Sequence, residues 1–115
     1  MELSKNEREI TPVSSWVNGA EIPMQIMRLD NFSGYNFDNF GGYAHWMLLN
    51  YSETPQLDEN GDPVVDGNGD PVMIVTKTPI TDGNTELPVS LVQSWGANDQ
   101  PIFDYVAQQI NITLI

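Results

Sequence analysis

The chain has 115 residues, which fits a single domain of the commonest size. Hydrophobic residues make up 40% of it, with three Trp, four Tyr and four Phe, so the chain can form a core and disorder of the whole chain is disfavoured. The absence of cysteine excludes disulfides, thiolate metal sites and a cysteine nucleophile.

The charge balance is strongly acidic, because four Lys and Arg residues stand against sixteen Asp and Glu residues for a formal net charge of −12. Such a surface repels phosphate backbones and anionic lipid headgroups. No segment has the length of a membrane-spanning helix, and residues 1–9 lack the pattern of a signal peptide. We therefore expect no free nucleic-acid partner, no membrane partner and no export signal.

Residues 1–10 are polar, with charges of alternating sign. They predict an N-terminal arm, which is either a frayed tail or a segment that orders on a neighbouring subunit. Residues 11–17 and 20–29 flank Asn18-Gly19, and this pair accepts the positive φ angles of a type I′ turn. The pattern predicts a β-hairpin, and a proline in each arm places it at a sheet edge.

The longest run of large apolar and aromatic residues spans residues 40–51. It predicts an interior strand that is covered on both faces. His45, the single histidine, lies in this strand with no evident partner, so we expect it to be packed and not catalytic. A pocket that gathers His45 with two carboxylates would favour an enzyme instead.

A stretch rich in Asn, Asp and Gly precedes this strand at residues 30–39 and contains Phe32, Tyr35 and Phe37. We expect a loop whose aromatic rings pack onto the sheet. A loop that binds carbohydrate would have a similar composition, and it remains the alternative.

Residues 53–71 hold six carboxylates, and nearly the same heptapeptide begins at Asp58 and again at Asp66. Each copy contains Asn-Gly-Asp-Pro, which predicts a turn, so we expect a protruding acidic insert. The spacing fails the EF-hand pattern in both registers. A looser calcium site remains an alternative to solvated turns, and its ligands would be Asp58, Asn60, Asp62, Asp66, Asn68 and Asp70.

The C-terminal part is expected to contain a strand at residues 72–78, a turn region around Asp82-Gly83-Asn84 and a further strand at residues 89–95. A helix follows, capped by Asn98 or Asp99, with a proline in its first turn and an end near Asn111. Its apolar stripe consists of Ile102, Phe103, Val106 and Ile110. Residues 112–115 return to an extended apolar form, and we expect this end of the chain to be buried.

Together these elements predict one α+β domain over residues 1–115, with the polar N-terminal arm at 1–10 and the acidic insert at 53–71. The sheet should be mainly antiparallel, with about five or six strands and one C-terminal helix packed across it. A β-sandwich with a terminal helix is the alternative.

Three segments resemble small virion proteins of tailed bacteriophages: the strand at 41–51, the Asp/Asn/Gly/Pro turn insert, and residues 89–112, which pass through Trp95-Gly96 into an acid-capped helix. The resemblance covers about residues 40–115 and rests on overall layout. It implies an assembly role in a capsid, neck or tail, and hence a place in the virion. It implies no functional residues.

Apolar side chains lie on both faces of several predicted strands, and a small domain has limited interior to receive them. Large exposed apolar patches on soluble proteins usually mark interfaces. We therefore expect a homo-oligomer with further contacts to other virion proteins. The interface candidates are Met27, Trp46, Leu48, Leu114 and Ile115.

The sequence therefore favours a non-enzymatic structural subunit without a cofactor. The alternative function is a small β-rich binding module for calcium or carbohydrate.

Overall fold

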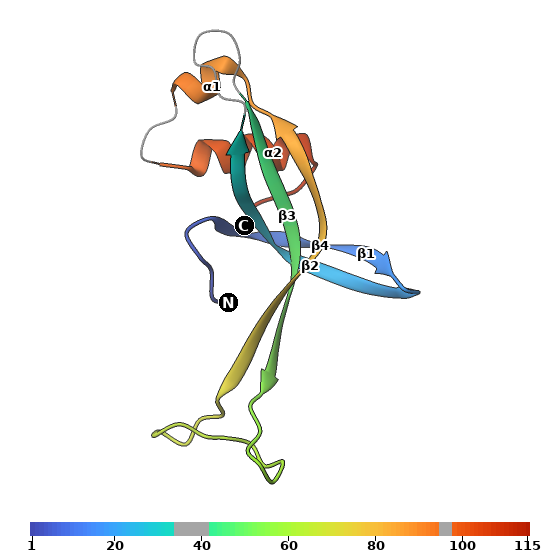
Figure 1. Ribbon diagram of the computed structural model, residues 1–115, viewed down its shortest axis with the longest axis vertical. Helices are drawn as coiled ribbons and strands as arrows, with labels where there is room; N and C mark the ends of the chain where they lie inside the picture. Colours follow the sequence, from blue (N-terminus) through green and yellow to red (C-terminus); the bar gives the residue numbers. More distant parts are fainter. Residues whose placement is uncertain (34–41, 95–97) are drawn as a thin grey trace.

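The computed structural model describes residues 1–33, 42–94 and 98–115, and within them the chain forms four strands and two helices (Figure 1). The elements are β1 (Glu7–Val17), β2 (Ala20–Ser33), β3 (Tyr43–Pro55), β4 (Met73–Glu86), α1 (Val89–Gln93) and α2 (Gln100–Gln109). All strands belong to one antiparallel sheet with the order β1-β2-β3-β4. The mainly antiparallel sheet and the C-terminal helix are confirmed. The predicted strand number was too high, and the described residues form one sheet instead of the two of a sandwich.

The β1–β2 hairpin forms where Asn18-Gly19 predicts it. Asn18 and Gly19 have φ angles of 51° and 81°, and the flanking residues Val17 and Ala20 pair directly. β1 begins earlier than expected, at Glu7, and both Glu7 and Ile10 are buried. Only the first six residues therefore precede the sheet, which makes the N-terminal arm shorter than the predicted range of 1–10.

β3 is an interior strand of the sheet, as predicted, because it pairs with β2 on one side and with β4 on the other. The prediction that both of its faces are covered is wrong, because Tyr43 is 42% exposed and residues 53–55 are exposed. A bulge between Leu48 and Leu49 interrupts the alternation of faces, and both residues are buried. Ala44 and Leu48 face the helices and belong to the main core. β3 therefore runs from the core beside the helices to Pro55, where it pairs with Met73 of β4.

The main core lies between the two helices and one face of the sheet (Figure 1). β2 and α2 supply most of it. Its buried members are Ile10, Met24, Met27, Leu29, Ala44, Leu48, Leu87, Val92, Ile102, Phe103, Val106 and Ala107. Within the described ranges, neither helix is long and apolar enough to cross a membrane.

α2 confirms the predicted terminal helix. Its apolar stripe is packed in or against the core, and the Asn98 side chain accepts a hydrogen bond from the Gln100 N–H at 3.0 Å. Asn111 follows the helix with a φ of 59°, and the Ile112 N–H donates to the Ala107 carbonyl at 2.8 Å. Asn111 therefore ends the helix as expected, in the left-handed conformation that asparagine tolerates.

The predicted strand at 89–95 is wrong, because residues Val89–Gln93 form the short helix α1. The carbonyl of Pro88 accepts hydrogen bonds from the N–H groups of Leu91 and Val92, both at 3.1 Å. Val92 is 2% exposed and Leu91 packs against the core. Burial therefore stabilises α1, although its two valines have a low intrinsic helix propensity and the helix is short.

The predicted turn around Asp82-Gly83-Asn84 is also wrong, because β4 continues through it to Glu86. Gly83 pairs with Trp46 of β3, and a Cβ atom added at Gly83 would lie 2.6 Å from Trp46 Cζ2. The absence of a side chain at Gly83 therefore leaves room for the Trp46 indole ring against β4, and Gly83 is not part of a turn.

The molecule is elongated, because two hairpins leave the body in different directions (Figure 1). Its radius of gyration is 17.9 Å and its extents are 61 × 37 × 23 Å, whereas a compact chain of this length has a radius of gyration of about 13 Å. We name residues 14–23, where β1 and β2 pair without β3, the N-terminal hairpin. We name residues 50–78, where β3 and β4 pair without β2, the acidic hairpin.

Candidate functional site

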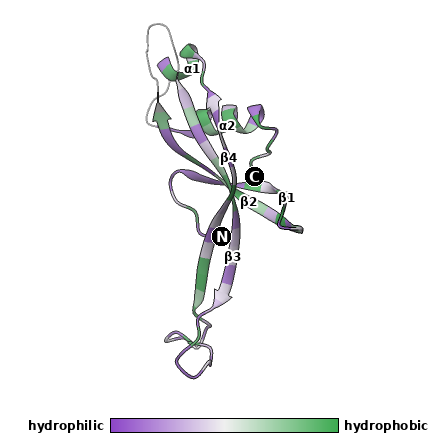
Figure 2. Ribbon diagram, turned by 45° about the vertical axis from the view of Figure 1, so that its right-hand side comes forward, coloured by the Kyte–Doolittle hydropathy of each residue, from purple (hydrophilic) through white to green (hydrophobic). Residues whose placement is uncertain are grey.

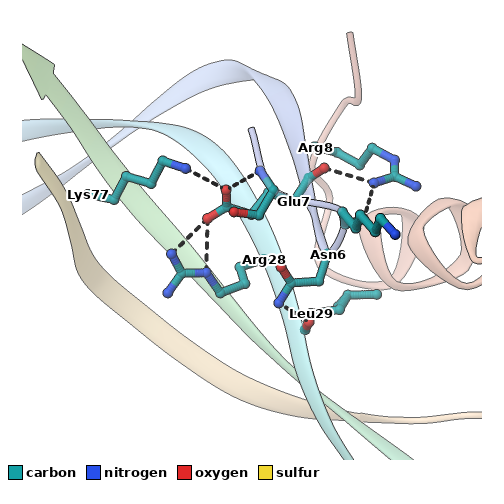
Figure 3. Close-up of polar contacts among 8 residues, drawn as sticks. Asn6, Glu7, Arg8, Arg28, Leu29 and Lys77 are labelled. Atoms are coloured by element: carbon teal, nitrogen blue, oxygen red, sulfur yellow. Dashed lines mark hydrogen bonds and ion pairs between the residues drawn. The ribbon is translucent and has the colours of Figure 1, made fainter. Parts of the chain in front are cut away.

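A buried carboxylate lies near the point where the two hairpins separate (Figure 3). The Glu7 side chain is fully buried; its Oε2 accepts hydrogen bonds from Arg28 Nε and Nη2 at 2.9 and 2.7 Å. Its Oε1 accepts from Lys77 Nζ at 2.6 Å and from the Ser4 N–H at 2.8 Å. Glu7 therefore connects β1, β2 and β4, with Lys77 at the base of the acidic hairpin.

Burial by itself would raise the pKa of Glu7. The hydrogen bonds from Lys77, the Ser4 N–H and Arg28 outweigh that effect and lower the pKa from 4.5 to about 2. The carboxylate is therefore charged across the ordinary pH range and balances two cations inside the protein. This cluster was not predicted from the sequence.

The N-terminal segment is anchored on both sides of this carboxylate. Asn6 exchanges hydrogen bonds with Leu29, through its own carbonyl and its side-chain amide, both at 3.0 Å (Figure 3). The Arg8 guanidinium lies 4.1 Å from the centre of the Phe103 ring, and its Nε donates to Gln100 Oε1 at 2.9 Å. The segment thus joins the sheet to α2, which the prediction of a frayed or subunit-bound tail did not include.

His45 has two carboxylate partners that the sequence did not indicate. Its Nδ1 lies 2.5 Å from Asp30 Oδ1 of β2, and its Nε2 lies 2.7 Å from Asp82 Oδ2 of β4. Both nitrogens can donate only when the ring is protonated, and the hydrogen bonds to Asp82 and Asp30 raise the pKa of His45 above 6.5. The imidazolium therefore links three strands, and neither nitrogen is available as a base in this arrangement.

We predict that His45 in the folded protein titrates above its ordinary pKa. Because the pKa of His45 is raised in the folded protein, its interactions with Asp30 and Asp82 stabilise the fold fully below about pH 6.5. This contribution to the free energy of unfolding is lost as pH rises through the folded pKa. The chain has one histidine, so its imidazole NMR signals need no assignment. Replacing Asp82 or Asp30 with asparagine should lower the measured pKa. The urea-unfolded chain is the control, and a folded pKa at or below the unfolded value would contradict the arrangement.

The interface candidates fall into two groups. Met27 and Leu48 are 0% and 5% exposed and belong to the chain's own core, so they are not surface positions. Trp46 and Leu114 are half-buried and pack against that core. Ile115 is 75% exposed, although its N–H donates to the Glu9 carbonyl at 3.0 Å. The expectation of a buried C-terminus is therefore met only in part: Ile112 and Leu114 are partly buried against the core, whereas the Ile115 side chain is exposed.

Among the described residues, most of the exposed large apolar side chains lie on the two hairpins, where the sequence predicted no interface candidate. Trp16 is 73% exposed in the N-terminal hairpin. Leu57, Val65, Met73 and Ile74 are 57%, 57%, 41% and 48% exposed in the acidic hairpin. The repeat could have indicated part of this pattern, because it places Leu57, Val65 and Met73 at intervals of eight residues.

The six residues of the possible calcium site come from two separate turns, one in each copy of the repeat. Asp58 and Asp66 each use Oδ1 to accept two backbone N–H groups of their own turn. Among the residues with described positions, which include the whole acidic insert, no three acidic, histidine or cysteine side chains are placed to hold a metal ion. The loop expected at residues 30–39 does not begin at Asp30, because β2 continues to Ser33 and Phe32 pairs with Ala44 of β3. Phe32 packs against the core, and Tyr35 and Phe37 lie outside the described residues.

The described part of the chain also contains no detectable pocket. Comparison with protein families, with curated proteins and with solved structures gives no match to this chain.

Proposed function

We propose that the chain is a non-enzymatic structural subunit that assembles with copies of itself and with other proteins, in the virion of a tailed bacteriophage. The observation that carries this proposal is that two hairpins extend from the body as two-stranded ribbons without a covering layer (Figure 1). An isolated two-stranded hairpin is at best marginally stable in water. Contact with neighbouring subunits would cover these ribbons and stabilise them.

The N-terminal hairpin is suited to contact between copies. Glu21 is the only charged residue between positions 10 and 27, so two such hairpins can approach without strong repulsion. Trp16 offers a large exposed ring beside the turn, and tryptophan is enriched among residues that dominate binding energy at interfaces. We assign self-association to this hairpin.

The virion setting is supported by the resemblance of the strand at 41–51, the acidic turn insert and the terminal helix to small structural proteins of tailed phages. The strand expected at 89–95 does not contribute to it, because residues Val89–Gln93 form α1. The elongated shape agrees with a role in assembly, because protruding ribbons reach neighbours that a compact body of this size would not reach.

Replacing Trp16 with serine should weaken self-association at least about tenfold, since a central tryptophan contributes about 2 kcal/mol or more at many interfaces. Sedimentation velocity over a range of protein concentrations measures this change. Leu57→Ser is the matched control, because it removes an exposed apolar side chain from the acidic hairpin.

Hydrogen exchange supplies the second readout. Amides of the N-terminal hairpin should exchange fast in dilute protein and become protected as the oligomer forms. A protein that stays monomeric at every concentration, with this hairpin protected as strongly as the core, would contradict the proposal.

A further inference from the structure

The end of the acidic hairpin is folded into a closed arrangement, which we name the acidic tip (residues 56–73). The Gln56 N–H donates to the Val72 carbonyl at 2.9 Å, the Val72 N–H to the Val64 carbonyl at 2.9 Å, and the Val64 N–H to the Gln56 carbonyl at 2.8 Å. The chain thus passes one point three times, at intervals of eight residues, and closes a ring of hydrogen bonds. The sequence repeat corresponds to a structural repeat.

The two turns between these passages are built alike. In each, the first aspartate, Asp58 or Asp66, accepts two backbone N–H groups on its side chain, at 2.8 to 3.1 Å. Its own N–H donates to the carbonyl four residues later, Asp62 or Asp70, at 2.8 Å in both turns. The backbone of the tip is therefore preorganised, so little conformational entropy remains to be lost when it binds.

The tip presents both apolar and acidic side chains to solvent. Leu57, Val65 and Met73 each follow a residue of the hydrogen-bonded ring and are all exposed. Five carboxylates and no cation lie between residues 56 and 72, and Figure 2 shows this end of the molecule as mainly hydrophilic. Apolar contacts surrounded by charge are the usual composition of a protein interface.

A second copy of this chain is a poor partner for the tip, because its cations are already engaged. Arg28 and Lys77 bind Glu7, and Arg8 lies over a ring of α2. Lys5 is the remaining cation, and the copy carries a net charge of −12. Like charges brought together cost free energy, whereas a basic partner would be attracted.

We propose that the acidic tip docks onto a basic surface of a different protein, with Leu57, Val65 and Met73 making the apolar contacts. This inference rests on the proposed function, since the docking would be one of the assembly contacts of the subunit. It assigns heterologous contact to the acidic tip and contact between copies to the N-terminal hairpin.

The test uses the full chain and synthetic peptides in which Lys alternates with Leu, with calorimetry at low and at physiological salt. The chain should bind these peptides at least about fivefold more tightly than peptides in which Lys alternates with Ser, and more weakly as salt rises. Asp62→Asn with Asp70→Asn should lower the affinity at least about fivefold, because both carboxylates are exposed and their side chains do not hold the turns.

Glu86→Gln with Asp104→Asn is the matched control, because it removes two exposed charges outside both hairpins. It should change the affinity less than about twofold, given screening over a Debye length of roughly 10 Å. Leu57→Ser should weaken peptide binding, and Trp16→Ser should leave it unchanged.

Three results would overturn the inference. The first is equal loss of affinity in the tip variants and the control variant, and the second is no binding of the Lys-Leu peptides. The third is weaker self-association in the tip variants, which would show that the tip contacts a copy. If only the tip inference is wrong, Trp16→Ser will still weaken self-association. If the proposed function is wrong, Trp16→Ser will leave self-association unchanged, so the two failures can be distinguished.

Discussion

Replacing Glu7 with glutamine is expected to lower the free energy of unfolding by about 3–5 kcal/mol, the usual cost of removing one partner from a buried ion pair. The fully buried side chain of Glu7 balances Arg28 and Lys77. Glutamine has one acceptor oxygen and would turn its amide N–H groups toward a cation. Urea unfolding followed by circular dichroism measures the loss, which is a large fraction of the total stability of a small domain.

The effect should depend on pH in a defined direction. The pKa of Glu7 is lowered from 4.5 to about 2 in the folded protein, so the unfolded chain binds the proton more readily. The contribution of the Glu7 carboxylate to the free energy of unfolding is therefore complete above about pH 4.5 and is lost as pH falls toward 2. The shift from 4.5 to about 2 corresponds to about 3 kcal/mol.

The difference in stability between the wild-type protein and Glu7→Gln should therefore be constant above about pH 5 and shrink toward zero near pH 2. Other carboxylates titrate in both proteins, so the difference isolates Glu7. Glu9→Gln is the control in the same strand and should change stability by less than about 0.5 kcal/mol. A difference that does not depend on pH would show that the Glu7 carboxylate is not the source of the stabilisation.

Parts of the fold with a local cause could be predicted from the sequence. Asn18-Gly19 defines the first hairpin because those two residues accept positive φ angles, and the observed angles are 51° and 81°. α2 follows from its apolar stripe and from Asn98 and Asn111 at its ends. In each case residues close in sequence indicate the backbone conformation, although packing against the core also stabilises α2.

Features that depend on distant residues could not be predicted. The partners of Glu7 lie 21 and 70 positions away, and those of His45 lie 15 and 37 positions away. α1 is stabilised by burial of Val92, whereas the alternating pattern of residues 89–95 favours a strand. Tertiary contacts decided all three, and single-sequence patterns do not encode such pairings.

The sequence also did not distinguish apolar residues of the core from apolar residues of the surface among the interface candidates. Met27 and Leu48 were selected because they are apolar, yet the helices bury them. The exposed apolar residues of the two hairpins became evident only when the pairing of β3 showed where the ribbons leave the body. Hydrophobicity predicts that a side chain will be covered, and the topology decides whether the chain itself covers it.

Replacing Gly83 with alanine should destabilise the protein by about 2 kcal/mol, because the added methyl group would overlap the indole ring of Trp46. The new Cβ would lie 2.6 Å from Cζ2 and 2.9 Å from Cε2 of that ring. Trp46 packs against the core, so the ring cannot simply swing away. Urea unfolding measures the loss, and the NMR signal of the Trp46 indole N–H should shift.

The control is Gly67→Ala in the acidic tip, where an added Cβ has nothing within 4 Å. It should leave stability unchanged or raise it by up to about 1 kcal/mol, since alanine restricts the unfolded chain. A double-mutant cycle with Trp46→Leu then tests the cause. If the indole ring produces the cost at Gly83, the alanine substitution should cost much less when leucine occupies position 46. An equal cost in both backgrounds would show that the strand backbone, and not Trp46, requires the glycine.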